Sequence, residues 1–568
     1  MKRILIIVCV ALTCAGIGWA GYRAVSPSDV PLSKFVPAGP LLYLEAQNFS
    51  SLLSDWNSSP QKKQWVKSDN YEVFSRSRLF LRLQGAGEQF AAAAGLSPDM
   101  DFFAQVAGQR SAVAIYDIGK LEFLYITYLP SAKSMESSLY QTRAKFEPRN
   151  AAGVDFYFRR DPQSEREVAF AISGDYLLLA TRQDLLASAL QLMSGKQDHT
   201  VETESWWTQS TAAAGHAGDL RMLLNLQTLV PDGYFRTYWV QQNITDLSQY
   251  SAAVSDLFRS GKEYREERVL IRKKESAQAA SAESLAAAAD LSRLIPENAG
   301  VYVTAANPSA DSCFALLETK ILAPHLGPGP ASQIAPQVQL TSGEQGGGSD
   351  LETRIDQAPA EAPATTSSAG ALKDLLSKTP ILASLQLQST QRDSAGVFVR
   401  IHSALVFAAA SDWSEDRVHS ALAEFVRPGL TAGQLGTSWQ QKSGYQQLDG
   451  LWPLTVVVLG KDLMVSDDPS LMETVLANVA RKPDRKPLEY FAGFHHQQER
   501  ENFTRFTSLV DHPNVPVTLG PRSEREPQFF SGNMASLSAI LADVSAERIE
   551  IRSDGGKVRQ TVIYEWSQ

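Results

Sequence analysis

The sequence predicts an α+β protein made of two tandem related domains, each an antiparallel sheet packed with helices. Three observations lead to this prediction. A strand-and-helix stretch occurs twice, the segment that opens the first copy also occurs twice, and several predicted strands follow one another through short turns. Strands joined by short turns pair antiparallel, whereas a doubly wound parallel sheet needs a long crossover after each strand.

The strand-and-helix stretch is the most informative repeat. Residues 172–190 return without a gap as residues 458–476, and Gly174 matches Gly460 as the turn residue before the strand. In both copies the apolar helix positions have the spacing i, i+1, i+4, i+5 and i+8, which gives one helix face packed on a sheet. The matched positions are Leu185, Leu186, Ala189, Leu190 and Met193 in the first copy and Leu471, Met472, Val475, Leu476 and Val479 in the second.

The opening segment supplies a second match. Residues 36–48 contain alternating apolar and polar positions, which predict a half-buried strand, and residues 295–307 repeat them. The identical pairs are Pro37 and Pro296, Tyr43 and Tyr302, Ala46 and Ala305, and Asn48 and Asn307.

The elements of the first copy follow in order. Residues 52–94 are predicted to be helical up to a turn at residues 95–98. A hairpin comes next, with a turn at residues 118–120 between strands at 112–117 and 121–128. We then expect one helix and three strands, at residues 131–146, 154–158, 167–172 and 176–181. The residues expected to pack from the long helical run are Trp56, Trp65, Phe74 and Phe80.

The second copy keeps this order. It predicts two strands, a helix and a short strand after Gly444, followed by the repeated strand and helix. The strands and the helix are expected at residues 383–388, 397–407 and 414–425. Each copy closes on a hairpin, whose last strand is predicted at residues 265–272 and at residues 559–566. Because start, middle and end repeat in one order, chance similarity of a single segment does not explain the pattern.

These matches set the predicted domain boundaries. The first repeat covers residues 34–272 and the second covers residues 294–568. Residues 273–293, rich in Ala, Ser and Glu, predict a helical linker between them. Residues 324–371 contain three consecutive glycines and no aromatic residue, so they can bury little surface. We expect them to form a disordered insertion within the second repeat.

Residues 1–25 predict export. Lys2 and Arg3 precede an uncharged stretch at residues 4–22. The stretch is either a signal peptide, with Gly18 and Ala20 at the cleavage positions, or a retained membrane anchor. In both cases the body of the chain lies outside the cytoplasm, either periplasmic or secreted. The membrane is a partner through this segment only if the segment stays uncleaved.

Cysteine content and charge narrow the class of protein further. Cys9 and Cys14 lie in the apolar N-terminal stretch. Cys313 is therefore the single cysteine in the body of the chain, so no intrachain disulfide can form there. The chain has 44% hydrophobic and 20% charged residues, as a folded protein does. Its formal net charge of -9 argues against a nucleic-acid partner, which needs a basic surface.

Three of these segments together resemble a known family. They are the opening with Pro37 and Tyr43, the hairpin at residues 112–128, and the strand at residues 174–180 before its amphipathic helix. The chain resembles a bacterial family of exported cell-envelope proteins known only as a domain of unknown function, with two tandem copies here. The resemblance implies a cell-envelope setting and carries no catalytic residues.

Few residues suggest chemistry. His496 and Glu499 are three apart and could share a helix face, but zinc needs more ligands than these, so a surface helix is the preferred interpretation. No nucleophile motif surrounds Cys313, which we interpret as a small buried hydrophobe. We therefore predict no catalytic, cofactor-binding or metal-binding residue and no cofactor.

Aromatic residues gather at Trp206 and Trp207 and again at residues 233–239. They could line a groove for an apolar or glycan ligand, because aromatic faces supply large contact areas. They could equally pack against a sheet or between the copies. Packing is favoured, because no polar residues converge nearby in the sequence.

The expected function is that of a non-catalytic, exported cell-envelope protein with a binding or structural role and an envelope protein or lipid as partner. The runner-up is a carrier of a hydrophobic ligand such as lipid, and the third alternative is an uncharacterised hydrolase. A large apolar cavity would favour the carrier, whereas close carboxylate or histidine pairs in a cleft would favour the enzyme.

Overall fold

The computed structural model describes residues 30–67, 69–76, 78–238, 247–274, 280–322, 370–392, 399–430, 439–448, 454–483, 485–496, 499 and 544–566. These residues form an α+β protein whose strand registers are all antiparallel, as the sequence predicts. The chain divides into two compact units. Unit 1 takes its described residues from Met1–Ala277 and Asp554–Gln568, and unit 2 takes them from Gln278–Phe506 and Val544–Ser553.

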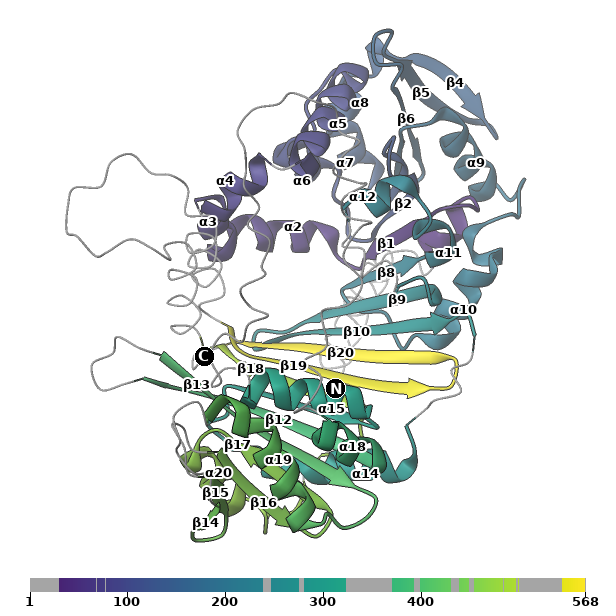
Figure 1. Cartoon of the computed structure of the whole chain (residues 1–568). Helices are drawn as coiled ribbons and strands as arrows, with labels where there is room; N and C mark the ends of the chain where they lie inside the picture. Colours follow the sequence, from purple (N-terminus) through teal and green to yellow (C-terminus); the bar gives the residue numbers. More distant parts are fainter. Residues whose placement is uncertain are drawn as a thin grey trace, which may run out of the picture. The chain divides into compact units, whose positions relative to one another are not determined.

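The sheet of unit 1 contains eleven described strands (Figure 1). Their spatial order does not follow the sequence, because β1 lies between β2 and β8. From one edge to the other the order is β4 (Glu147–Ala151), β5 (Val154–Arg160), β6 (Glu167–Ser173), β7 (Tyr176–Ala180), β3 (Glu122–Tyr128), β2 (Ser111–Asp117), β1 (Leu42–Ala46), β8 (Leu220–Leu224), β9 (Tyr250–Arg259), β10 (Glu263–Arg272) and β20 (Lys557–Trp566).

Helices cover both faces of this sheet, and Figure 1 shows α5 to α8 on one side of the strands and α9 on the other. The α9 side also carries η1 and α10, and the opposite side is reached by the helices that follow β1. Their bounds are η1 (Leu32–Phe35), α2 (Phe49–Ser58), α3 (Pro60–Val66), α4 (Asp69–Ser75), α5 (Arg78–Ala94), α6 (Met100–Val106), α7 (Ser131–Glu136), α8 (Ser138–Gln141), η2 (Arg143–Lys145), α9 (Gln183–Met193), η3 (Val201–Thr203), α10 (Ser205–Ala213), α11 (Leu226–Leu229) and α12 (Gly233–Tyr238).

The alternation along each strand decides which core a side chain enters. Leu178 and Ala180 of β7 point to the α9 side, whereas Leu177 and Leu179 point to the side of α5 and α6. Because side chains alternate between faces with a period of two, a strand covered on both faces is apolar throughout. This explains why residues 177–180 read Leu-Leu-Leu-Ala rather than alternating apolar and polar.

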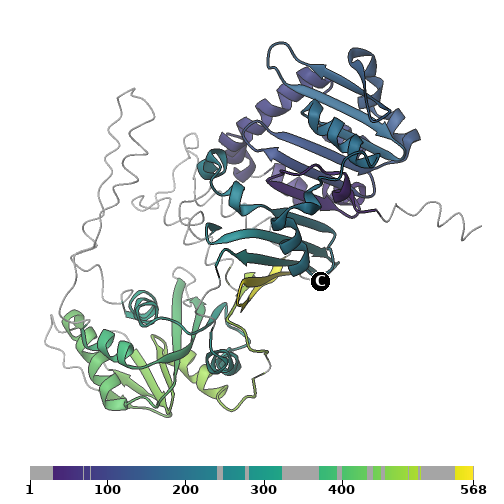
Figure 2. The ribbon, with the colours of Figure 1, turned by 90° about the vertical axis from the view of Figure 1, so that its right-hand side faces the viewer.

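The sheet of unit 2 contains nine described strands, and Figure 2 shows helices on both sides of its green strands. In spatial order these are β14 (Trp439–Gln441), β15 (Gln446–Leu448), β16 (Leu454–Leu459), β17 (Asp462–Ser466), β13 (Val399–Ala409), β12 (Ile381–Arg392), β11 (Val301–Ala306), β18 (Tyr490–His495) and β19 (Val544–Asp554). Its helices are α14 (Ala282–Leu291), η4 (Ser292–Leu294), α15 (Ala310–Leu316), η5 (Leu317–Leu322), α18 (Gly370–Lys378), α19 (Glu415–Leu430) and α20 (Pro469–Ala477).

The two glycines singled out in the sequence occupy tight turns. Gly174 joins β6 to β7 with a φ of 57°, and Gly460 joins β16 to β17 with a φ of 58°. Only glycine adopts this left-handed conformation without a steric cost, which explains its presence at both turns.

Two predicted helices are broken into shorter ones. The run at residues 52–94 forms α2, α3, α4 and α5, and the helix at residues 131–146 forms α7, α8 and η2. Ser137 causes the second break: its backbone is extended, with ψ at 148°, and its hydroxyl accepts the N–H of Tyr140 to cap α8. Serine competes with the helical backbone for hydrogen bonds, so it favours such a cap.

The packing predicted for the aromatic residues of this run is correct for three of the four. Trp65 and Phe80 belong to a cluster of ring contacts completed by Tyr71 and Phe74. Trp56 is instead 48% exposed, because it lies on the outer face of α2.

The observed units differ from the predicted boundaries at two places. The helix predicted within 273–293 forms as α14, but Ala288 and Leu291 are buried in a core of unit 2. The final strand β20 pairs with β10 in unit 1, although the sequence assigns residues up to 568 to the second repeat. An edge strand such as β10 presents unpaired backbone groups, and β20 satisfies them.

Two predicted segments lie outside the described residues. They are the N-terminal segment at residues 1–25 and almost all of the insertion at residues 324–371. The exception is Gly370 and Ala371, which begin α18 and so belong to a helix.

We predict that Gly493→Ala destabilises unit 2. A Cβ on Gly493 would lie 2.1 Å from Cζ of Tyr302, the residue opposite it in register on β11. Tyr302 is held by stacking on Phe491 at 5.2 Å, so it cannot move without loss. Overpacking of this kind costs about 1–3 kcal/mol, measured as a lower urea midpoint.

Gly556→Ala is the control for this prediction, because no atom lies within 4 Å of the Cβ that it adds. We expect its midpoint to match that of the wild type. Equal midpoints for the two variants would show that the Tyr302 ring does not fill the space above Gly493.

Candidate functional site

Unit 1 contains a cavity of about 530 Å³ between its sheet and the helices α5 and α6. Its volume lies in the range of small-molecule sites, roughly 300–1,000 Å³. Apolar side chains make up most of its wall. Those from the helices are Leu83, Ala86, Phe90, Phe102, Phe103 and Val106, and those from the strands include Leu44, Val113, Phe123 and Leu179.

The sequence of α5 explains why space remains here. Leu83, Ala86, Gly87 and Phe90 have the spacing i, i+3, i+4 and i+7, so they lie on one helix face. The two central positions of that face carry almost no side chain. The helix therefore spans the sheet with large residues at the ends of the contact and a gap between them.

The burial of residues on the two faces of the strands β2 and β3 also indicates the gap. On the α9 side, Ala112, Ala114 and Leu124 are 2% exposed or less. Their neighbours Val113 and Phe123, which point the other way into the cavity, are only half-buried. One face of these strands is filled and the other is not.

The cavity reaches the surface beside two apolar side chains. Leu83 is 49% exposed and Phe103 is 39% exposed, and both line the cavity. Burying an apolar side chain contributes about 1.5–3 kcal/mol, so leaving these two exposed forgoes a stabilising contact. Exposed apolar residues at the mouth of a hollow indicate an entry for an apolar ligand.

The hydroxyl groups in the wall already have partners within the fold. Tyr125 donates to the carbonyl oxygen of Val106 at 2.8 Å, and Ser111 Oγ lies 2.6 Å from Thr127 Oγ1. Burial raises the pKa of Tyr125, so the phenol stays neutral. Thr181 Oγ1 accepts the N–H of Phe123 at 2.8 Å. These groups close hydrogen bonds within unit 1 and leave most of the cavity surface apolar.

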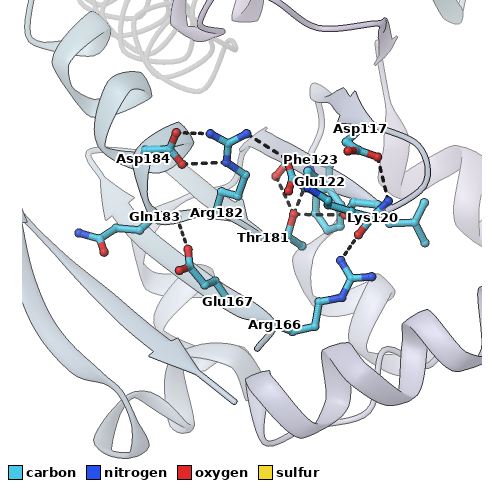
Figure 3. Close-up of polar contacts among 11 residues, drawn as sticks. Asp117, Lys120, Glu122, Phe123, Arg166, Glu167, Thr181, Arg182, Gln183 and Asp184 are labelled. Carbon is cyan, nitrogen blue, oxygen red and sulfur yellow. Dashed lines mark hydrogen bonds and ion pairs between the residues drawn. The ribbon is translucent and has the colours of Figure 1, made fainter. Parts of the chain in front are cut away.

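Charged residues gather at one edge of the cavity (Figure 3). Arg182 donates to Glu122 at 2.9 Å and to both carboxylate oxygens of Asp184. These bonds raise the pKa of its guanidinium, the bond to Asp184 contributing most. Glu167 accepts the backbone N–H of Gln183 at 3.1 Å.

Arg166 is the cation that lines the cavity at this edge. Its Nε donates to Oε1 of Gln89 at 2.8 Å, and its Nη1 donates to the carbonyl oxygen of Lys120. Both acceptors are neutral oxygens. No local sequence pattern indicates this site, because its residues come from α2, α5, α6 and six strands far apart along the chain.

Two buried carboxylates elsewhere in unit 1 bear on the hydrolase alternative. Glu45 accepts Nε of Arg110 at 2.7 Å and the hydroxyl of Tyr43 at 2.6 Å. Asp256 is held by Arg221 through two bonds, of 2.7 Å and 2.8 Å. Each carboxylate has its own arginine, an arrangement that secures buried charges in a fold.

The candidate metal ligands do not form a site. His495 ends strand β18, which pairs with β11 and β19, and the helical backbone expected at His496 and Glu499 follows directly after it. Nε2 of His496 lies 3.8 Å from Oε2 of Glu547, while Glu499 is buried against Gly300. Among the described residues, no group of three or more His, Cys, Asp or Glu side chains could hold a metal ion.

Cys313 is fully buried on α15, as the interpretation of a small hydrophobe requires. Burial raises the pKa of its thiol to about 12, so almost no nucleophilic thiolate exists at neutral pH.

The aromatic residues singled out in the sequence pack in the core of unit 1, as predicted. Trp206 and Trp207 are buried on α10, with the Trp207 ring 4.9 Å from that of Tyr43. Phe235 is buried beside α11, and Trp239 lies outside the described residues.

In the described part of the chain, no helix is both long enough and apolar enough to span a membrane.

Comparisons with known proteins show one distant structural similarity. No protein-family model and no curated protein sequence matches the chain. Solved structures of TP0453, a Treponema protein, are similar to part of it at a TM-score of 0.24. Crystal form I is 12% identical, with 44% of this chain and 82% of TP0453 covered, and form III is 13% identical, with 44% and 83% covered. The family resemblance inferred from the sequence stays a prediction.

We predict that two adjacent residues of β2 differ sharply in their tolerance of a larger side chain. Val113→Phe places its added atoms in the cavity, so the melting temperature stays near that of the wild type. Ala114→Phe forces a ring into the filled core against α9, where Ala114 is 0% exposed, and costs about 1–3 kcal/mol or more.

Thermal melts of both variants measure this difference. Equal losses of stability in the two would show that the space beside Val113 is closed in solution.

Proposed function

We propose that this protein is a non-catalytic protein of the bacterial cell envelope that carries an apolar ligand, such as a lipid acyl chain, in the cavity of unit 1. The cavity is the observation that carries the proposal. Its wall is mostly apolar, its hydroxyl groups are bonded to other groups of unit 1, and its mouth is flanked by Leu83 and Phe103. An apolar ligand would bury this surface and lose no hydrogen bond.

The hydrolase alternative receives less support. Among the residues that line the cavity there is no histidine, cysteine or aspartate. Ser111, a hydroxyl in the wall, contacts the hydroxyls of Thr127 and Tyr125, and neither of these is a base at neutral pH. Nucleophilic catalysis needs a base within hydrogen-bond reach of the nucleophile.

We also propose that the two units are duplicated copies of one fold. The strand order β4-β5-β6-β7-β3-β2-β1-β8-β9 in unit 1 corresponds one for one to β14-β15-β16-β17-β13-β12-β11-β18-β19 in unit 2. The sequence offset that relates Gly174 to Gly460 also relates Leu177 to Leu463 and Leu179 to Val465. Leu177 and Leu179 are buried in a core of unit 1, and Leu463 and Val465 are buried in the corresponding core of unit 2.

This correspondence supports a difference of role between the copies. In unit 2, the face of Leu463 and Val465 is packed by α15, α18 and α19, with Leu317 and Val418 both 0% exposed. In unit 1, the corresponding face meets α5 and α6 across the cavity. Under this proposal unit 2 supports the structure and unit 1 binds the ligand.

The cell-envelope setting rests on the sequence. Lys2, Arg3 and the uncharged stretch up to residue 22 support export, and an uncleaved segment would tether the carrier to the membrane that holds its ligand.

Binding of an apolar probe tests the carrier proposal. We expect the full chain to bind N-phenyl-1-naphthylamine with enhanced fluorescence, and Val113→Phe to weaken that binding at least tenfold by filling the cavity. Ile401→Phe, at a site 52% exposed in unit 2, is the control and should bind as the wild type does. Equal affinity of the wild type and both variants for the probe would show that the probe does not bind in the cavity, which would contradict the carrier proposal.

A second experiment tests export. Alkaline phosphatase fused to the C-terminus should be active in a bacterial host, because that enzyme folds only outside the cytoplasm. Replacing Leu5, Ile6, Ile7 and Val8 with Asp should abolish the activity, since charged residues block membrane insertion at about 2.5–3.5 kcal/mol each. A fusion that is inactive in the unaltered protein would contradict export.

A further inference from the structure

We propose that the ligand of the unit 1 cavity is a single-chain amphiphile with an anionic oxygen head group, a carboxylate or a phosphate, which is bound by Arg166. The inference rests on the proposed carrier function and adds to it the chemistry of the head group. It is carried by the position of one arginine and by the nature of that arginine's partners.

The first step is the position of the cation. Arg166 lies immediately before β6 and lines the cavity together with Leu121 and Thr181. The side chain is only half-buried, so it remains accessible to solvent. An acyl chain in the apolar space would therefore have a guanidinium beside one end.

The second step is the fixed orientation of that cation. Gln89 on α5 accepts Nε of Arg166, and the carbonyl oxygen of Lys120 in the β2–β3 turn accepts its Nη1. Figure 3 shows the contact with Lys120. An arginine held in this way loses little further rotational freedom when it binds a head group. Such preorganisation reduces the entropic cost of binding.

The third step is the contrast with Arg182, which lies in the same polar cluster. Arg182 is neutralised by two carboxylates, Glu122 and Asp184. Arg166 forms no ion pair with any described residue, and the partners that hold it are neutral. Its positive charge is therefore left for a group outside the fold.

Glu167 also lines the cavity and must be considered, because a carboxylate repels an anionic head group. Its carboxylate accepts the backbone N–H of Gln183, at the start of α9. Figure 3 shows the two side chains pointing in different directions, Glu167 toward Gln183 and Arg166 toward Lys120. The fold thus holds the negative group away from the arginine that would receive the head.

The volume limits the number of chains. A cavity of about 530 Å³ lies in the lower half of the range for small-molecule sites, roughly 300–1,000 Å³. One acyl chain fits this space better than the two chains of an ordinary phospholipid. Palmitate and hexadecyl phosphate represent the two anionic sources, and hexadecanol is the matched neutral compound.

Competition binding on the full chain, kept in amphipol, tests the inference. We expect wild-type protein to bind palmitate or hexadecyl phosphate at least tenfold more tightly than hexadecanol, since charge-assisted bonds to guanidinium favour the anion. The anion that binds more tightly identifies the head group as a carboxylate or a phosphate. Arg166→Gln should remove this preference and leave hexadecanol binding unchanged, whereas Arg166→Lys should retain part of it.

Arg160→Gln is the control, because Arg160 pairs with Glu165 at 3.4 Å on the exposed end of β5 and does not line the cavity. It should behave as the wild type. Equal wild-type affinity for hexadecanol and for both anions would overturn the head-group inference and leave the carrier function intact. Failure of all three compounds to bind would overturn the carrier function itself. The wild-type comparison decides the inference even if Arg166→Gln does not fold.

Discussion

The architecture of both units depends on one constraint, the strict alternation of side chains along antiparallel strands that are covered by helices on both faces. A central strand such as β7 must supply two cores at once, so its residues 177–180 are all apolar. The helices then decide how completely each core is filled. On the α9 side of unit 1, Leu186 and Ala189 close the space against the sheet, and both are 0% exposed.

The opposite face of unit 1 shows what happens when a covering helix carries small residues. At Ala86 and Gly87, α5 leaves a hollow, and the strand residues beneath it remain half-buried. A hollow of this size forgoes dispersion and hydrophobic stabilisation that a filled core would supply. The corresponding face of unit 2, packed by residues such as Leu317 and Val418, shows that the same strand arrangement accommodates a filled core. A binding site in unit 1 would require such a cost in stability at this face.

Three charged groups of unit 1 show how the fold pairs charges. The buried carboxylates Glu45 and Asp256 each have an arginine, and Arg182 has two carboxylates. Such pairing offsets the desolvation of charges inside the fold. Arg166, at the cavity edge, is held by neutral oxygens instead. Its position at the hollow is why the two features support one ligand-binding proposal.

The sequence by itself determined the elements whose signals are local: the hairpin turn at residues 118–120, the left-handed glycines 174 and 460, and the amphipathic helices that follow them. It could not determine that α5 leaves a gap, because Ala86 and Gly87 read as ordinary helix residues until the facing strands are known. It also does not predict the strand β18, since the pairing of β18 with β11 joins residues almost 200 positions apart. Likewise β20 pairs with β10 across a still longer separation in the chain, from Glu263 to Glu565. Only tertiary structure decides such pairings, because backbone hydrogen bonds between distant strands leave no local pattern in the sequence.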